Sequence, residues 1–364
     1  QGGANPSASL RPRKRIRLEA MSRLADKRRS LAALQITRRG VPGANGPVRR
    51  QIHTLQEGQK IFDLYTWKEV LQESGDGGKV VVCRPKEEPD SPVSPGGTKR
   101  RDKYVMKMRS KKELREKRLE DTFRKVQERT LNLPPHDGIV QLIDVLEDDD
   151  FYFLVMEKAS GGSFFEGLLN EYTTGIIPIS EMKRMTMEML KAVQHLHNQG
   201  MLHRDIKPDN FVMEVRDEPD SPTGKLVSPK LCDFDHAHPD WAPNIEHKRQ
   251  QSGGRWGTVT FNAPETFLAQ CSEQSDLYSV GACLYLLMTG SMPYPNDLFD
   301  DGSLEEMYHR MQKVEINWGC DPFPDQPLCK ELCQGLLAWD EKDRIKSCEE
   351  ALQSRWFVET SDNY

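Results

Sequence analysis

The spacing of apolar residues changes character along the chain. Between about residues 60 and 158, short apolar runs such as KVVVCR, KYVMKM and FYFLVME have the length and composition of strands. From about residue 163 onward, apolar residues recur every three or four positions, which predicts helices with one buried stripe. In EMKRMTMEMLKAVQHLHNQG this stripe consists of Met182, Met185, Met189, Val193 and Leu196. QSDLYSVGACLYLLMTG is apolar nearly all round, which predicts a helix inside a core.

A small strand-rich lobe is therefore expected to precede a larger helical lobe, in the α+β class. The charged stretch SKKELREKRLEDTFRKVQERTL, between the second and third strand, is expected to be helical. We expect four parts: a basic N-terminal extension over 1–58, the strand-rich lobe over 59–158, the helical lobe over 159–358 and a tail over 359–364.

Charge is unevenly distributed along the 364 residues. The formal charge of the chain is −5, but residues 1–60 hold 14 basic against 3 acidic residues, and the remainder carries −16. Few apolar residues and many Arg, Gly, Pro and Ser predict disorder over the first 55 or so residues. Three interpretations of this segment stay open: a solvated tail, a nuclear-localisation or nucleic-acid patch, and an organelle transit peptide.

Composition bounds the compartment. No run of 18 apolar residues occurs, so we expect no transmembrane helix and no membrane partner. The eight cysteines form no CxxC pair, which favours reduced thiols inside the cell. We expect the cytoplasm or nucleus, or a plastid or mitochondrion if the N-terminal segment is a transit peptide.

Several motifs follow one another in the second half of the chain. HRDIKPDN spans 203–210, LCDFDHAH spans 231–238 and GTVTFNAPE spans 257–265. Together with YVMK at 104–107 they resemble eukaryotic protein kinases of the serine/threonine type, over about 65 to 358. The C-terminal part is somewhat similar to calmodulin-dependent-type kinases. The resemblance implies a bilobal kinase fold: a small antiparallel-sheet N-lobe with one main helix, and a larger mainly helical C-lobe.

The resemblance also implies ATP and Mg²⁺ as cofactors, protein substrates, and a role for each motif residue. Asp205 would accept the proton of the substrate hydroxyl, and Lys207 would reach the γ-phosphate. Asn210 and Asp233 would hold magnesium, since carboxylate and amide oxygens are its preferred ligands. Lys107 of YVMK would hold the α- and β-phosphates.

The acidic partner of Lys107 is expected to come from the helix that follows it. Glu128 is our first choice and Glu120 the alternative, because that helix holds several acids and its register is not fixed by sequence.

The resemblance places the nucleotide between a glycine-rich hairpin and a hinge. The hairpin ESGDGGKV keeps Gly75, Gly78 and Val80, but Glu73 stands at the first glycine of the family pattern. Met156 in FYFLVME would be the gatekeeper. The remaining nucleotide-binding positions are Val105, Glu157, Ala159, Ser163 and Val212.

Further residues are implied to organise the C-lobe. Thr258 would contact the catalytic Asp and Lys, Glu265 would pair with Arg344, and Asp276 would receive catalytic-loop amides. GTVTFNAPE, 257–265, resembles the end of the kinase activation segment, and Arg204 is expected to bind a phosphate on that segment. The candidate phosphorylation sites there are Ser252, Thr258 and Thr260.

Three positions depart from the family pattern: Glu73, Asp235 in place of the glycine of Asp-Phe-Gly, and Asn262 in place of a tyrosine. Asp235 removes glycine's backbone freedom, so we expect a stiffer switch with the chemistry retained. The alternative is a pseudokinase scaffold that binds ATP without turnover. Nucleic-acid binding through the basic tail would account for none of the motifs after residue 60. We therefore expect no nucleic-acid partner beyond that tail.

Four serines directly precede a proline. They lie in or close after two similar segments, EEPDSP at 87–92 and DEPDSP at 217–222. They are Ser91, Ser94, Ser221 and Ser228. One interpretation is surface turns, since Pro-Asp-Ser-Pro is typical of turns. The other is phosphorylation by an upstream proline-directed kinase.

Overall fold

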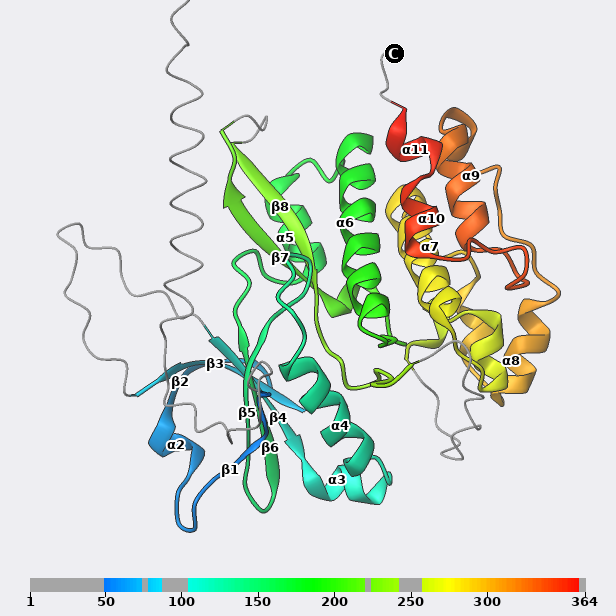
Figure 1. Ribbon diagram of the computed structural model, residues 1–364. Helices are drawn as coiled ribbons and strands as arrows, with labels where there is room; N and C mark the ends of the chain where they lie inside the picture. Colours follow the sequence, from blue (N-terminus) through cyan, green and yellow to red (C-terminus); the bar gives the residue numbers. More distant parts are fainter. Residues whose placement is uncertain (1–48, 74–77, 87–103, 220–223, 242–256, 360–364) are drawn as a thin grey trace, which may run out of the picture. The chain divides into compact units, whose positions relative to one another are not determined.

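Six strands of the N-terminal half form one sheet in the order β1-β5-β6-β4-β3-β2 (Figure 1). Their bounds are His53–Thr54 for β1, Tyr65–Gln72 for β2, Lys79–Pro85 for β3, Tyr104–Ser110 for β4, Leu142–Glu147 for β5 and Phe151–Glu157 for β6. All neighbours pair antiparallel except β1, which runs parallel to β5. The predicted antiparallel sheet is therefore confirmed for five strands, and the two-residue β1 is an addition.

The computed structural model describes residues 49–73, 78–86, 104–219, 224–241 and 257–359. Residues 51–364 group together as one unit, separate from 1–50. Several positions singled out in the sequence lie outside the described residues. They are Gly75, Ser91, Ser94, Ser221, Ser252 and the basic segment RPRKRIR.

The central strand β4 has two faces of opposite character. Successive side chains of a strand alternate between faces. Met106 and Met108 point into an apolar cluster with Ile61 and Tyr65, and both methionines are buried. Lys107 therefore lies on the other face, which is the face that carries charge.

The charged stretch after β4 forms two helices rather than one. Helix α3 spans Lys111–Glu116 and α4 spans Glu120–Leu131. Between them Arg118 adopts a φ of 57°, in the left-handed region that ends a right-handed helix. Helix α4 is the main helix of this lobe and packs against β5 through its apolar side.

The C-lobe is mainly helical. Its α-helices are Phe164–Glu171 (α5), Ile179–Asn198 (α6), Glu273–Thr289 (α7), Leu304–Met311 (α8), Pro327–Leu336 (α9), Cys348–Leu352 (α10) and Arg355–Val358 (α11). The hairpin of β7 and β8 spans Phe211–Asp217 and Lys225–Leu231. Short 3₁₀ turns lie at Pro208–Asn210, Val259–Phe261, Pro264–Leu268, Asn296–Phe299 and Phe323–Asp325. The short helix α2, Ile61–Leu64, belongs to the N-lobe.

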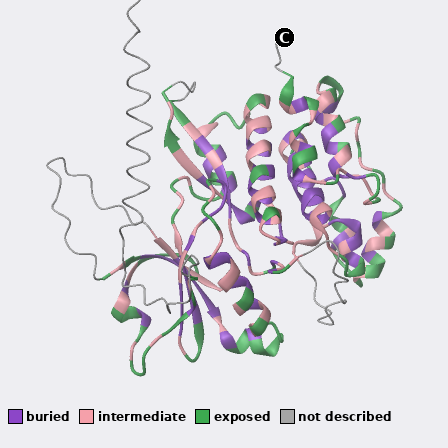
Figure 2. Cartoon of the chain, in the orientation of Figure 1, coloured by how far each residue is buried: buried purple, intermediate pink, exposed green. Residues whose placement is uncertain are grey.

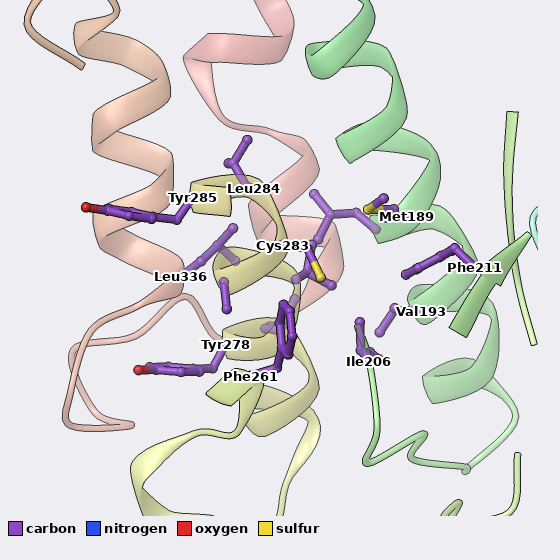
Figure 3. Packing of buried hydrophobic residues seen from close by; sticks show 14 of the residues in the cluster. Met189, Val193, Ile206, Phe211, Phe261, Tyr278, Cys283, Leu284, Tyr285 and Leu336 are labelled. Atoms are coloured by element: carbon purple, nitrogen blue, oxygen red, sulfur yellow. The ribbon is translucent and has the colours of Figure 1, made fainter. Parts of the chain in front are cut away.

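Helices α6 and α7 carry the core of this lobe (Figure 3). Met189 and Val193 of α6 belong to the same buried cluster as Cys283 and Leu284 of α7. Helix α7 is buried over most of its length, as Figure 2 shows, which agrees with its nearly continuous apolar sequence. The predicted core helix and the predicted stripe on α6 are both confirmed.

Within the described ranges, no helix combines the length and apolarity that crossing a membrane requires. All eight cysteines are free thiols.

Close packing between α7 and α9 gives a stability prediction. A Cβ added at Gly281 would lie 2.7 Å from Leu336 Cβ and 3.1 Å from Leu337 Cγ, so the two helices would have to separate. We expect Gly281→Ala to lower the free energy of unfolding by about 1–3 kcal/mol, the usual cost of overpacking. Urea denaturation measures this. The control is Gly319→Ala, whose nearest contact would be 3.5 Å from Asn317. Equal stability of the two variants would contradict the close approach.

Candidate active site

One buried carboxylate holds the loop between α6 and β7 in place. Asp276 of α7 is 1% exposed, and it accepts the backbone amides of His203 at 2.9 Å and Arg204 at 2.8 Å. Burial raises the pKa of Asp276, but the hydrogen bond and charge of His197, 2.9 Å away, bring it below its usual range. Asp276 therefore stays ionised and fixes the loop.

Asp205 stands at the centre of a polar cluster on this loop. Asn210 donates from Nδ2 to Asp205 Oδ2 at 2.7 Å, and Lys207 Nζ lies 3.3 Å from the same oxygen. Thr258 donates to Asp205 Oδ1 at 3.2 Å and accepts from Lys207 at 2.5 Å. The structure thus brings together four residues that the sequence singled out.

Asp233 lies beside Asn210 because of the β7–β8 hairpin. The amide of Cys232 donates to the carbonyl of Asn210 at 2.8 Å, directly before Asp233. Asp233 has a φ of 63°, a conformation that Asp tolerates better than most residues. The Asn210 side chain donates from Nδ2 to the backbone carbonyl and to the carboxylate of Asp205, which leaves its amide oxygen to act as a ligand. A carboxylate and an amide oxygen suit Mg²⁺.

Lys107 reaches Asp233 across the lobes. Its Nζ lies 2.7 Å from Asp233 Oδ1 and 2.9 Å from Asp235 Oδ2. Burial raises the pKa of Asp233, but the charge and hydrogen bond of Lys107 outweigh it and lower the pKa to about 2. Burial lowers the pKa of Lys107, and Asp235 and Asp233 more than reverse that effect. Asp233 and Lys107 are therefore both ionised at neutral pH.

The expected helix partner of Lys107 is corrected by this geometry. Glu128 lies 3.4 Å from Arg124, and Glu120 lies 2.7 Å from Arg115. The Glu128 side chain is 45% exposed, and the half-buried Glu120 also accepts from the hydroxyl of Tyr152 at 3.3 Å. Their carboxylates are engaged with Arg124 and Arg115, and the carboxylates on Lys107 come from the segment after β8.

Sequence inspection missed two residues of this cluster. Asp235 was expected to stiffen a switch, and nothing in its neighbourhood along the chain pointed to Lys107. Arg109 Nε lies 3.2 Å from Asp235 Oδ2. The alternation of strand residues offered a signal for Arg109, because residues two apart on β4 share a face.

The glycine-rich hairpin is described only in part. Gly78 has a φ of 79°, and a Cβ there would lie 2.1 Å from the carbonyl oxygen of Met108, so only glycine fits. Glu73 is exposed and lies 3.2 Å from Lys79 Nζ. Its charge is paired along the hairpin.

The strand positions expected to face the nucleotide lie in register. Val80 pairs with Lys107 and Val105 with Met156 across the sheet. The amide of Glu157 donates to the carbonyl of Gln141 at 3.1 Å. The carboxylate of Glu157 is bound by Lys230.

At the start of α5, Ser163 acts as a helix cap. Its hydroxyl donates to Glu166 at 2.7 Å, and its backbone bridges to Val212. The nucleotide-binding roles of these residues and of Ala159 stay predictions.

Arg204 is occupied by backbone carbonyls. Its Nε donates to His236 at 2.6 Å and its Nη2 to Ala237 at 3.2 Å. Phosphate binding by Arg204 stays a prediction, and Thr258, one of the three proposed sites, is engaged with Asp205 and Lys207.

Glu265 and Arg344 form the predicted ion pair. Two bonds join them, at 2.7 Å and 3.0 Å, and both residues are buried. Arg344 also donates to the carbonyls of Ala338, Gln274 and Trp339.

Ser228 is the one Ser-Pro serine among the described residues. It lies inside β8, and its hydroxyl donates to Glu188 at 3.4 Å. A phosphate there would stand beside a carboxylate, so the structure gives the proline-directed site at Ser228 no support.

Comparison with known proteins agrees with this geometry. A family model described as the protein kinase domain matches residues 93–357. CDPK-related kinase 1 of Arabidopsis thaliana is 28% identical over 230 residues. Hormonally up-regulated neu tumor-associated kinase of Homo sapiens is 29% identical over 227 residues. Calcium-dependent protein kinase 4 of Plasmodium falciparum is 26% identical over 258 residues.

These alignments are partial on both sides. They cover 62%, 62% and 70% of this chain, and 36%, 28% and 44% of the three relatives. The chain thus spans less than half the length of the relatives it matches. The resemblance inferred from the motifs is confirmed at the level of the domain.

Proposed function

This chain belongs to the protein kinase domain family, and from that premise we propose that it transfers the γ-phosphate of ATP to serine or threonine hydroxyls of proteins. The observation that carries the proposal is the cluster around Asp205. A carboxylate held by Asn210, Lys207 and Thr258 has the surroundings that a catalytic base of phosphoryl transfer needs.

Asp205 receives the proton of the acceptor hydroxyl. Its carboxylate is fixed on both oxygens, so its orientation is set before the substrate arrives. Lys207 adds positive charge on the same side, where the transferred group gathers negative charge. Thr258 ties the activation segment to this pair.

Asn210 and Asp233 would hold magnesium, which neutralises the phosphate oxygens as charge develops. Lys107 orients the α- and β-phosphates, and Gly78 lets the hairpin backbone approach them. Each of these residues acts by position and charge, and phosphoryl transfer requires little else from a protein.

The second candidate is a scaffold that binds ATP without turnover. The observation in its favour is Asp235, which adds a carboxylate 2.9 Å from the lysine that should meet the phosphates. A further negative charge at that point opposes an anionic ligand.

A transfer assay separates the two functions. The full chain is incubated with Mg²⁺, γ-labelled ATP and a generic basic protein, beside Asp233→Asn. ATP binding is measured in parallel by calorimetry. We expect label on the protein with wild type and a loss of at least roughly 100-fold with the variant, since a metal ligand is removed. ATP binding by wild type without transfer would establish the scaffold.

A further inference from the structure

Strand β4 buries two cations on one face. Lys107 is 5% exposed and Arg109 is 8% exposed, and they are two residues apart. Buried charges require counter-charges, because the interior solvates ions poorly. Asp235 Oδ2 forms an ion pair with both cations, at 2.9 Å from Lys107 Nζ and 3.2 Å from Arg109 Nε. The Asp235 side chain is itself only 11% exposed.

Helix α4 offers no carboxylate on its buried side. Its buried residues are Phe123, Val126, Gln127, Thr130 and Leu131. The only side-chain amide in this group, that of Gln127, is 2% exposed, and its Nε2 has no hydrogen-bond partner among the described residues. The acids of α4 lie on its other faces.

The helix is docked to the sheet by a different ion pair. Arg124 of α4 donates from Nη1 to both oxygens of Glu147 on β5, at 2.9 Å and 3.0 Å. Lys111, at the start of α3, donates to Glu147 at 2.8 Å. Docking of α4 therefore does not require a bond to Lys107.

We propose that Asp235 is the positioning residue that holds Lys107 for the phosphates, in the place of a helix carboxylate. The proposal rests on the proposed function and assigns it one further residue. Asp233 would hold a metal, and the bond of Asp235 to Lys107 would then keep the ammonium aimed at the site. Lys107 is then ordered by the segment after β8, independently of α4.

The test compares Asp235→Asn with Glu128→Gln in the full chain. Each variant removes one carboxylate, from the proposed partner or from the helix acid that lies on Arg124. Mg·ATP affinity is measured by calorimetry, and KM for ATP and for a basic protein substrate by steady-state kinetics. We expect Asp235→Asn to weaken ATP binding roughly 10- to 100-fold, the effect of losing a charge-assisted hydrogen bond. Glu128→Gln should bind ATP like wild type, and KM for the protein substrate should not change.

Two further variants keep the result interpretable. Glycine adopts nearly any backbone angle, so Asp235→Gly replaces Asp235→Asn in the test if thermal unfolding shows that Asp235→Asn does not fold. Asp235→Glu keeps a carboxylate and should recover part of the lost affinity. Unchanged or tighter ATP binding by both Asp235→Asn and Asp235→Gly would overturn the proposal, as would weakening by Glu128→Gln alone. Wild-type ATP binding without transfer would refute the proposed function, while the affinities would still test Asp235.

Discussion

Replacing Asp205 with asparagine is expected to lower kcat roughly 10²- to 10⁴-fold, the contribution of a positioned general base. The substitution is nearly isosteric, and an amide oxygen can still accept from Asn210 and Lys207. The fold and the nucleotide site should therefore survive while the proton acceptor is lost. Steady-state kinetics with a protein substrate measures kcat, and calorimetry measures ATP affinity.

The matched control is Asp209→Asn. Asp209 lies on the same loop but is exposed, and it makes none of the contacts that hold Asp205. We expect its kcat to stay within a few-fold of wild type. If Asp205→Asn retained a tenth or more of wild-type kcat, Asp205 would not be the base.

Replacing Arg344 with methionine is expected to cost about 3–5 kcal/mol of unfolding free energy, since it leaves a buried carboxylate without its counter-ion. Arg344 is 1% exposed, and its guanidinium reaches Glu265 as well as the carbonyls of Ala338 and Trp339. The residue anchors Glu265, at the end of the activation segment, to the stretch between α9 and α10. Urea denaturation of the full chain measures the loss.

Arg355→Met is the control for that experiment. Arg355 pairs with Glu359 at 2.8 Å, but both side chains are at least half exposed. Such surface pairs contribute little to stability, because solvent and salt screen them. A similar cost for the two substitutions would show that burial adds nothing to the Glu265–Arg344 pair.

The sequence predicts functional residues best where they lie close together in one motif. HRDIKPDN holds Asp205, Lys207 and Asn210 within six positions, so one motif delivers most of the loop chemistry. The apolar spacing of α6 and α7 likewise predicts which lobe is helical, because helix periodicity is a short-range property. Residues that are far apart in the sequence but in contact in the fold leave no local pattern that predicts the contact. Asp235 reaches Lys107 from another lobe, and only the fold brings them together.

The register of α4 and the pairing of β1 explain the remaining differences between the sequence predictions and the structure. The acids of SKKELREKRLEDTFRKVQERTL could not be assigned to a face, because the break at Arg118 resets the helix. Once α4 begins at Glu120, Gln127 faces inward and Glu128 faces Arg124. Strand β1 has two residues and follows no periodicity, so its parallel pairing with β5 is visible only in the structure.

The most direct test of the central claim is to identify the residue that receives the phosphate. The full chain is incubated with Mg²⁺, γ-labelled ATP and a basic protein, and the labelled amino acids are separated after hydrolysis. We predict label on phosphoserine or phosphothreonine, and none when Asp205→Asn replaces wild type. ATP bound by the wild-type chain with no labelled amino acid would contradict a kinase, and label on tyrosine alone would contradict the serine/threonine acceptor.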